Sequence, residues 1–545
     1  MKVVIVGGVA GGMSAAARLR RLDNEAEIIV LEKSGYVSYA NCGLPYFVGG
    51  VIEEESSLLL QTPSSLYERF RIDVRTNHEA LRLDRDRHLL VVKNLITDRI
   101  EELSYDVVVL SPGASPIVPP IDGIERASVL RNVEDVQSIV ANLRAHPKTA
   151  VVIGGGFIGV ELAENLTNRG INVMIVEASP QVLTPLDSEM AEVVAKELSS
   201  HGVELHLSDA VVRVSEDHVE LDSGLLLEAD MVIVAIGVRP EVGLARDAGL
   251  TIGARGGIVV DDCNRTSDLA VYAIGDAAEK RDALDASATL VPLANIANRQ
   301  GRVVADHIAG RTVRANPSIG TAIVKVFDLT VASTGWNEKR LRAAGHAFIA
   351  VHTHPFSHAT YFPDARPMSL KLLVDPDTGA ILGAQGIGSD GVDKRIDVLA
   401  TAIRAGLPAV ALADLELAYA PPFGSAKDPV NMLGYIVENR LSGLVETVQW
   451  DEVGDLVQQE IIDVRSREEF SEGALPRALN IPLDELRERV GELHSRDVIV
   501  YCQVGQRGHV AALLLSQLGF RSRNLDGGYE TWRYSPASSE LVASV

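Results

Sequence analysis

One pattern occurs twice in this chain: an apolar strand, a glycine-rich turn, a helix, and a second apolar strand that ends in an acid. The two copies cover residues 3–32, ending in Glu32, and residues 150–177, ending in Glu177. Such a βαβ unit binds a dinucleotide, because the turn lets the backbone approach the pyrophosphate, the helix N-terminus faces the phosphates, and the acid meets a ribose hydroxyl. One glycine fingerprint is a weak signal. Two of them, each with an acid at the right distance, predict two Rossmann-like dinucleotide-binding domains.

The turns supply the first candidate cofactor-binding residues. They are Gly7, Gly8, Ala10 and Gly12, with Glu32 and Lys33 after the second strand, and in the second copy Gly154, Gly156, Gly159 and Glu177. The first copy has Val9 where the motif expects its middle glycine. The motif alone therefore does not predict that the backbone at Val9 closely approaches the pyrophosphate.

Bulk properties exclude several classes of protein. A length of 545 residues predicts several domains. The net charge of −23 argues against a nucleic-acid binder, which needs a basic face. Three cysteines cannot build a disulfide framework and suit a reducing compartment. We find no signal peptide and no apolar run long enough to span a membrane, so we expect a cytoplasmic protein without a membrane or nucleic-acid partner.

A third segment, residues 271–276, is a strand that ends in Gly275-Asp276. It resembles the second flavin-binding motif of FAD-dependent pyridine nucleotide reductases, in which the aspartate hydrogen-bonds the ribityl chain. Residues 110–113, with Pro112 and Gly113, and residues 235–237, ending in Gly237, resemble the motifs that connect the two nucleotide domains of that family. The resemblance implies FAD at the first fingerprint and NAD(P)H at the second.

The expected fold class is α/β, with a nested arrangement of domains. We place an FAD domain at 1–112 and 240–318, an NAD(P)H domain at 113–239, and an α+β segment that resembles the family's dimerisation domain at 319–446. The composition changes around 442–452, and the strand and loop pattern from there on resembles an α/β rhodanese domain, at 450–545.

Cys42 lies ten residues after Glu32, on an expected loop that runs into a helix below the flavin. Two-cysteine disulfide reductases carry a second cysteine five residues away, and this chain has none. A lone cysteine stores an electron pair by forming a mixed disulfide, a persulfide or a sulfenic acid with an outside atom. We expect the helix N-terminus and the flavin to stabilise its thiolate.

The wider resemblance rests on three segments, residues 7–12, 39–46 and 419–428, together with the C-terminal domain. They are similar to those of coenzyme A-disulfide reductase–rhodanese fusions, which include NADH-dependent persulfide reductases, over essentially the whole chain. The resemblance implies a homodimer in which Cys42 is the redox nucleophile and Tyr361 and Tyr419 donate hydrogen bonds or a proton at the sulfur. For coenzyme A it implies Ser38, Asn41, the helix-end cations Arg18 and Arg21, and Lys427 of the partner subunit.

Nucleotide preference depends on Glu177. A carboxylate there accepts a hydrogen bond from a free ribose 2′-hydroxyl and repels a 2′-phosphate. The sequence therefore favours NADH over NADPH, although the family contains both preferences.

Cys502 begins a six-residue loop that ends in Arg507 and leads into a helix. Successive N–H groups of such a loop form an anion nest that stabilises a thiolate and then a persulfide. Six residues is the length associated with sulfur, whereas related seven-residue loops suit phosphate. We therefore expect Cys502 to carry sulfane sulfur.

The remaining cysteine and the histidines carry no motif. Cys263 is expected to pack as a structural residue. Among the 13 histidines, only His352, His354 and His358 have suggestive spacing, and we predict no metal site.

The expected reaction passes electrons from NADH through FAD to a disulfide or persulfide on Cys42, with Cys502 delivering or receiving sulfane sulfur. Expected substrates are coenzyme A persulfide, other small persulfides, polysulfide and coenzyme A disulfide. One alternative is an NADH oxidase or peroxidase that uses a Cys42 sulfenic acid, but the resembling enzymes carry a histidine at the position of Ala10. Another is a non-catalytic sulfur carrier or redox sensor.

Overall fold

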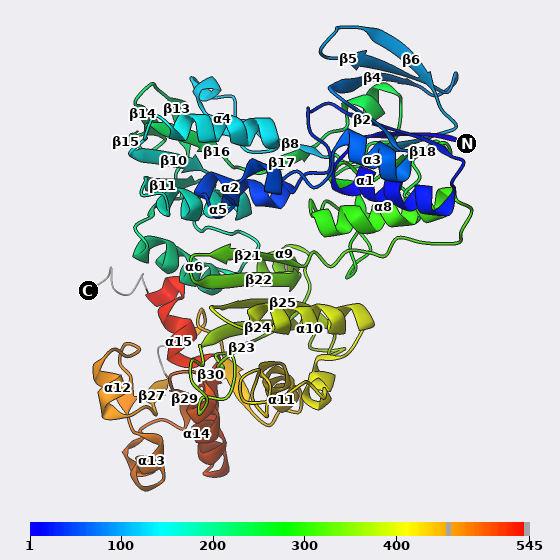
Figure 1. Ribbon diagram of the computed structural model, residues 1–545. Helices are drawn as coiled ribbons and strands as arrows, with labels where there is room; N and C mark the ends of the chain where they lie inside the picture. The colour runs from blue at the N-terminus through cyan, green and yellow to red at the C-terminus, as the bar shows by residue number, and fades with distance from the viewer. Residues whose placement is uncertain (454–458, 539–545) are drawn as a thin grey trace. The chain divides into compact units, whose positions relative to one another are not determined.

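The computed structural model describes residues 1–453 and 459–538 (Figure 1). The chain consists of two compact units. The first unit comprises Met1–Pro180 and Gly202–Ser318, and the second comprises Gln181–His201 and Ile319–Val545. Residues 454–458 and 539–545, which fall in the predicted rhodanese domain, lie outside the described residues. Within the described part of the chain, no helix has the length and apolar character needed to cross a membrane.

A five-stranded parallel sheet forms the core of the first nucleotide-type fold in unit one. Its strands, in spatial order, are β18 (Val271–Ala273), β7 (Val107–Leu110), β1 (Lys2–Val6), β2 (Glu27–Glu32) and β3 (Asp73–Thr76). The middle residues of β1 are fully buried because both faces of the sheet are covered, as is usual for parallel sheets. Helices α1 (Ala10–Leu22) and α8 (Ala294–Ile308) pack on one face. The antiparallel strands β4 (His78–Asp84), β5 (Leu89–Asn94) and β6 (Ile100–Ser104) pack on the other.

The second nucleotide-type fold repeats this plan. Its parallel strands, in spatial order, are β12 (Glu204–Leu207), β11 (Asn172–Glu177), β10 (Thr149–Ile153), β16 (Met231–Val234) and β9 (Ser128–Val129). Helix α5 (Phe157–Thr167) packs against β10 and β11. A small antiparallel sheet of β13 (Val211–Val214), β14 (His218–Leu221) and β15 (Leu226–Glu228) shares a hydrophobic core with the larger sheet.

Short elements complete unit one. They are α2 (Leu44–Gly49), α3 (Pro63–Phe70), α4 (Val133–Leu143) and α7 (Gly243–Asp247), the strand pair β8 (Ala114–Pro116) and β17 (Val238–Pro240), and the strand pair β19 (Lys280–Arg281) and β20 (Ala288–Thr289). Short 3₁₀ turns include η1 (Asn41–Gly43), which precedes α2, and η4 (Gly275–Ala277), which follows β18. Helix α2 packs against α5, and this places η1 and α2 beside the second nucleotide-type fold.

Unit two contains two sheets. The first is antiparallel, with the order β21 (Ala322–Val326), β22 (Leu329–Gly335), β25 (Ile381–Gly388), β24 (Met368–Val374) and β23 (Ile349–Thr353). Helices α10 (Val392–Ala405) and α11 (Pro429–Leu441) share its core, and α6 (Ser188–Ser200) and α9 (Glu338–Ala343) also belong to this unit.

The second sheet of unit two is parallel, with the order β26 (Glu446–Val448), β30 (Arg521–Leu525), β29 (Asp497–Tyr501), β27 (Glu460–Asp463) and β28 (Leu479–Asn480). Its helices are α12 (Arg467–Ser471), α13 (Leu483–Arg489), α14 (Gln506–Gln517) and α15 (Gly528–Arg533). Two small cores lie on its faces, and Cys502 belongs to one of them. The α/β fold class predicted from the sequence is confirmed.

Candidate functional site

The two fingerprint turns share one backbone geometry. Gly7 has φ +102° and Gly154 has φ +110°, a region that favours glycine. A Cβ atom at Gly7 would lie 2.0 Å from the carbonyl oxygen of Ser111, and one at Gly154 would lie 2.6 Å from that of Ala235. Both first glycines are therefore required by the backbone alone.

The acid at the end of the second strand is bound to the turn in both copies. Glu32 accepts hydrogen bonds from the N–H groups of Gly8 (2.7 Å) and Ser34 (2.9 Å). Glu177 accepts them from the N–H groups of Gly155 and Ser179, both at 2.8 Å. Burial raises the pKa of Glu32, and the backbone hydrogen bonds oppose that rise. Each carboxylate thus has a fixed position beside its glycine turn.

The later residues of the two fingerprint motifs have different structural roles. A Cβ at Gly12 would lie 1.9 Å from the Gly7 oxygen, and one at Gly159 would lie 2.0 Å from the Gly154 oxygen, so these glycines let each helix pack on its own turn. A Cβ added at Gly156 would meet no described atom within 4 Å beyond its chain neighbours, which leaves open space beside the backbone. Val9 takes the equivalent N-cap position with φ −110°, an angle open to any residue, and Ala10 begins α1.

The remaining residues predicted to bind cofactor also lie in unit one. Gly113 has φ +74° with no described atom within 4 Å of a Cβ, and Gly237 and Gly275 have φ +113° and +71°. Burial raises the pKa of Asp276, with Lys280 and then Arg131 opposing that rise, and no described residue donates a hydrogen bond to its carboxylate. Pro112 accepts a hydrogen bond from Arg131 (3.3 Å), whereas the exposed Lys33 pairs with Glu79 (2.7 Å). Open glycine turns and a carboxylate without a donor fit an extended dinucleotide such as FAD.

Cys42 is exposed on η1, immediately before α2. Partial desolvation raises the pKa of its thiol, and the carboxylates of Glu161 and Asp276 raise it further. Among the chain's described groups no cation is a cause that lowers this pKa, and the expectation that the helix N-terminus and the flavin stabilise the thiolate stays a prediction. The helix that follows has only six residues, and the charged groups that face the sulfur are acids.

Two predicted substrate residues flank this cysteine. Ser38 adopts φ +50° and its N–H donates to the Gly8 oxygen at 2.8 Å, which ties the cysteine loop to the first fingerprint. Asn41 opens η1 and is exposed.

In unit two, the structure brings the two predicted tyrosines together. The hydroxyls of Tyr361 and Tyr419 lie 2.8 Å apart, and the residues are 74% and 48% exposed. The hydrogen bond to Tyr419 is the largest cause of the raised pKa of Tyr361. Lys427 is exposed in the segment that leads into α11.

The two arginines predicted for coenzyme A have different surroundings. Arg18 donates two hydrogen bonds to Asp306 of α8, at 3.0 and 2.6 Å, so its charge is already balanced inside the protein. Arg21 is exposed at the end of α1. The sequence could not reveal the Arg18 pair because its partner is 288 residues away.

The Cys502 loop is short and rigidly held. Cys502 follows β29 and is fully buried, and α14 begins at Gln506 with Gly505 as its N-cap at φ +87°. The Cys502 carbonyl accepts from the N–H of Tyr529 at 2.8 Å. Arg507 donates two hydrogen bonds, at 2.7 and 2.6 Å, to Glu469. The Arg507 guanidinium, in the first turn of α14, is therefore already paired with the Glu469 carboxylate.

Two groups of interacting side chains, one half-buried and one fully buried, carry no sequence motif. In unit one, the Tyr46 hydroxyl donates to Glu161 at 3.3 Å, close to Cys42. In unit two, Lys371 is fully buried with its Nζ 2.9 Å from Asp187, 2.5 Å from Glu189 and 2.7 Å from Glu338. The only signal in the sequence is a charged residue within an apolar helix or strand.

Cys263 and the three spaced histidines have local partners. The Cys263 thiol donates to the Val313 oxygen at 3.3 Å. His352 binds Asp526 (2.6 Å) and Glu189 (3.0 Å), and His354 binds Ser369 and Thr531. His358 contacts the Ala359 oxygen, so in the described chain these histidines do not converge on one point.

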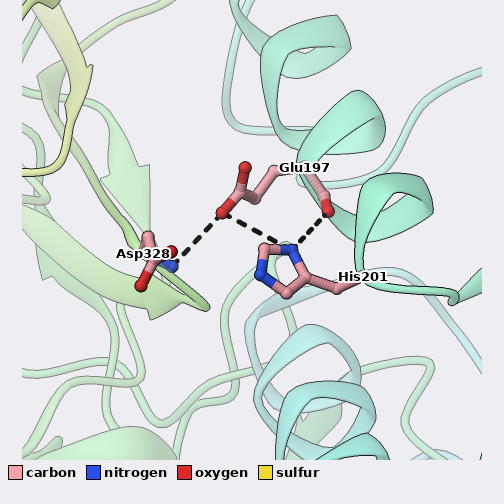
Figure 2. A group of neighbouring side chains, drawn as sticks. All are labelled: Glu197, His201 and Asp328. Atoms are coloured by element: carbon pink, nitrogen blue, oxygen red, sulfur yellow. Dashed lines mark hydrogen bonds and ion pairs between the residues drawn. The ribbon is translucent and has the colours of Figure 1, made fainter.

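A different trio, Glu197, His201 and Asp328, places its potential ligand atoms within 4.8 Å of one another (Figure 2). Its groups already bind each other: the N–H of Asp328 donates to the Glu197 carboxylate at 3.2 Å, and His201 Nδ1 lies 3.0 Å from the Glu197 backbone oxygen. The His201 ring also stacks on Phe327. The trio closes the end of α6.

Comparison with known proteins agrees with this geometry. Residues 1–301 match the family model described as pyridine nucleotide-disulphide oxidoreductase. The chain belongs to this family. Residues 321–429 match the dimerisation domain of the same oxidoreductases, and residues 449–535 match a rhodanese-like domain. The predicted family and the predicted FAD and NAD(H) cofactors are thereby confirmed, and the protein is an oxidoreductase.

Individual relatives of this oxidoreductase cover most of its length. A coenzyme A disulfide reductase of Staphylococcus aureus is 35% identical over 436 residues, which is 80% of this chain and 99% of that protein. The reduced Bacillus anthracis CoADR-RHD structure is 48% identical, with a TM-score of 0.96 over 98% of both chains. A NAD-dependent persulfide reductase from A. fulgidus is 39% identical, with a TM-score of 0.93 over 98% of this chain and 100% of the other.

Proposed function

We propose that this oxidoreductase reduces coenzyme A disulfide and small persulfides or polysulfide with NADH at Cys42, and that its rhodanese domain handles sulfane sulfur at Cys502. One observation carries the proposal. A lone exposed cysteine lies beside a flavin-type fingerprint, and a second cysteine begins a backbone N–H loop in a separate domain. The identities to reductases of both substrate types support it.

The two fingerprint turns would hold the two nucleotides. Gly7, Gly12, Glu32 and Asp276 would hold FAD, and Gly154, Gly156, Gly159 and Glu177 would hold NADH. Bound together, these cofactors supply the electron pair that cleaves a sulfur–sulfur bond. The Glu177 carboxylate, aligned beside its turn, would accept a hydrogen bond from the 2′-hydroxyl of NADH and repel the phosphate of NADPH.

At the sulfur, Cys42 would attack the substrate and form a mixed disulfide or persulfide. Tyr361 and Tyr419 would protonate the departing thiolate, since one hydroxyl donates to the other and the accepting hydroxyl keeps its own O–H free to donate. Ser38 and Asn41 would line the approach to Cys42. The exposed cations Arg21 and Lys427 would meet the phosphates of coenzyme A, and in a homodimer Lys427 would come from the partner subunit. Arg18 is already paired with Asp306, so its role would be in packing.

At the second site, Cys502 would hold sulfane sulfur as a persulfide within the turn that precedes α14. The N–H groups at the start of α14 would stabilise its negative charge, and Asn524 fixes the loop by donating to the Gly505 oxygen at 3.1 Å. Arg507 would orient the loop through its pair with Glu469. The free cysteines suit a cytoplasmic location, where thiols stay reduced.

The test is steady-state NADH oxidation by the flavin-loaded enzyme with four acceptors side by side: coenzyme A persulfide, coenzyme A disulfide, polysulfide and hydrogen peroxide. We expect turnover with the sulfur acceptors and little with peroxide, because Ala10 replaces the histidine expected of a peroxidase. Turnover faster with peroxide or oxygen than with every sulfur compound would overturn the proposal in favour of a sulfenic acid enzyme.

A further inference from the structure

Strand β23 is the edge strand of the antiparallel sheet in unit two, and its outer side is bound by the rhodanese-like segment. The backbone N–H of His352 donates to the Asp526 carboxylate at 2.9 Å, and the Ala350 carbonyl accepts from the Gln449 side chain at 3.0 Å. Strand β23 lies in the part of the chain that matches the dimerisation domain, whereas Asp526 and Gln449 lie in the rhodanese-like match. Backbone groups that an edge strand leaves unpaired therefore bind the domain that carries Cys502.

The His352 ring adds a second bond to the same carboxylate. Its Nδ1 lies 2.6 Å from Oδ2 of Asp526, its Nε2 lies 3.0 Å from Oε1 of Glu189, and its side chain is 1% exposed. A carboxylate accepts hydrogen bonds, so both ring N–H groups donate. The same Oδ2 also lies 3.3 Å from the Gln449 amide nitrogen. The backbone and the ring of one buried histidine therefore fix the position of Asp526.

Two glycines follow Asp526 and lie between β23 and the Cys502 loop. Gly527 and Gly528 have φ +67° and +66°, a region that favours glycine. A Cβ added at Gly527 would lie 2.8 Å from the Cβ of His352, and one at Gly528 would lie 2.4 Å from the Cys502 carbonyl oxygen. The turn is therefore in close contact with His352 on one side and with the sulfur site on the other.

The residues after the glycines hold the Cys502 loop at three points. The Tyr529 N–H donates to the Cys502 carbonyl, and the Glu530 N–H donates to the Gln503 carbonyl, both at 2.8 Å. The Gln503 amide nitrogen also donates to the Glu530 carboxylate at 2.9 Å. Each carbonyl shares a rigid peptide plane with the N–H of the next residue. Fixing these two carbonyls therefore fixes the direction of the N–H groups of Gln503 and Val504.

We propose that His352 is a positioning residue for the sulfur chemistry of Cys502: it holds Asp526, and Asp526 holds the turn that orients the Cys502 loop. The inference rests on the proposed function of Cys502 and adds to it a requirement for the neighbouring domain. N–H groups that already face the sulfur stabilise a thiolate and a persulfide without reorganisation. Without the His352 bond the turn would loosen, and sulfur uptake would slow although Cys502 itself is unchanged.

The test follows sulfur uptake at Cys502, with thiosulfate as the probe. The Cys502 thiolate attacks the outer sulfur of thiosulfate, whose sulfur–sulfur bond breaks as a new one forms on Cys502 and sulfite departs. Flavin-loaded, full-length protein that carries Cys42→Ser is mixed with thiosulfate, and the persulfide in the Cys502 peptide is followed by mass spectrometry. Cys42 is thereby removed as a competing acceptor.

Two substitutions of His352 separate the bond to Asp526 from the rest of the ring. An asparagine side chain branches at the same carbon as the imidazole, so its amide nitrogen takes the place of Nδ1 and can still donate to Asp526. A glutamine branches one carbon further on, and its amide takes the place of Nε2, beside Glu189. We expect uptake to be slower by roughly tenfold to a hundredfold in His352→Gln and close to the native rate in His352→Asn.

Both substitutions remove a buried imidazole, so both should lower the melting temperature, and stability alone does not distinguish them. Hydrogen exchange does. The peptide that contains Tyr529 and Glu530 should exchange slowly in the native protein and in His352→Asn, and faster in His352→Gln. If His352→Gln does not fold, Gln449→Leu takes its place, because it removes a half-buried donor to the same carboxylate. It should slow uptake severalfold.

The inference is overturned if Cys502 takes up sulfur as fast in His352→Gln as in the native protein, or if His352→Asn is slowed as deeply as His352→Gln. For Gln449→Leu, an unchanged rate would overturn it. Failure of the proposed function has a different signature: the protein with an intact His352 gains no sulfur at Cys502, whatever the exchange of the turn shows.

Discussion

At the scale of single residues, Glu32 and Glu177 have the same local role in two different nucleotide sites. Each carboxylate accepts one hydrogen bond from an N–H of its glycine turn and another from the N–H of the residue two positions after the acid itself. Removing either carboxylate would leave two N–H groups without their acceptor, and it would also remove the group that we propose meets the ribose. The consequences should differ only in which nucleotide is affected.

We predict that Glu177→Ala narrows the preference for NADH over NADPH. Loss of the ribose hydrogen bond should weaken NADH recognition by about 1–3 kcal/mol, whereas NADPH loses a repulsive partner. The ratio of kcat/KM values for the two nucleotides measures this effect. Glu32→Ala is the control, and it should lower flavin content and leave that ratio unchanged. An unchanged ratio in Glu177→Ala would mean that Glu177 does not read the ribose.

Some residues of the site could be found from the sequence and others could not. The fingerprint glycines could, because their spacing and the acid that follows them lie within about 30 residues of chain and repeat one known pattern. The resemblance points to Tyr361 and Tyr419 one by one, and the contact between their hydroxyls is visible only in the fold. The Asp306 partner of Arg18 could not be found, since α1 and α8 are far apart in sequence. The raised pKa of Cys42 depends on Glu161 and Asp276, which only the fold brings near.

At the scale of elements, the turn between β10 and α5 separates two kinds of glycine. Gly159 touches its own turn, whereas Gly156 faces open space. We predict that Gly159→Ala destabilises the protein before any nucleotide binds, because its Cβ would lie 2.0 Å from the Gly154 oxygen. Gly156→Ala should keep the native melting temperature and weaken NADH binding, because a methyl group would fill the approach to the backbone. Equal NADH affinity in Gly156→Ala and the native protein would contradict this assignment.

Strand β23 carries the second prediction at this scale. His352 binds Asp526, at the end of β30, and Glu189 of α6, so one buried imidazole joins three segments of unit two. Burial alone would lower its pKa, but the hydrogen bonds with Asp526 and Glu189 raise it to about 9. The folded value lies above the unfolded value of about 6.5. The stabilisation is therefore complete below about pH 6.5 and is lost as pH rises through about 9.

We predict that His352→Gln lowers the melting temperature of unit two most at about pH 6, and that the difference from the native protein shrinks by about pH 9.5. Thermal unfolding followed across that range measures the effect. His494→Gln is the control, because the His494 side chain is 91% exposed and its removal should change little at any pH. A difference that is constant with pH would mean that His352 is neutral in the folded protein.

At the scale of the whole molecule, the proposed function gives the chain two separable sulfur sites. Cys42 is exposed and lies beside the nucleotide folds of unit one, whereas Cys502 is buried within its own loop in unit two. Neither cysteine has a second thiol among its described neighbours. A small diffusible persulfide should therefore need only Cys42, and sulfur transfer from thiosulfate or polysulfide should need only Cys502.

The most direct measurement compares Cys42→Ser and Cys502→Ser in NADH oxidation with coenzyme A persulfide, with both variants loaded with flavin. Two separable sites predict that Cys42→Ser keeps its yellow flavin and loses sulfur-dependent turnover. Cys502→Ser should largely retain that turnover while losing sulfurtransferase activity. Full activity in Cys42→Ser, or a loss in Cys502→Ser as deep as that in Cys42→Ser, would contradict the account, since sulfur would then bypass Cys42 or pass obligatorily through Cys502.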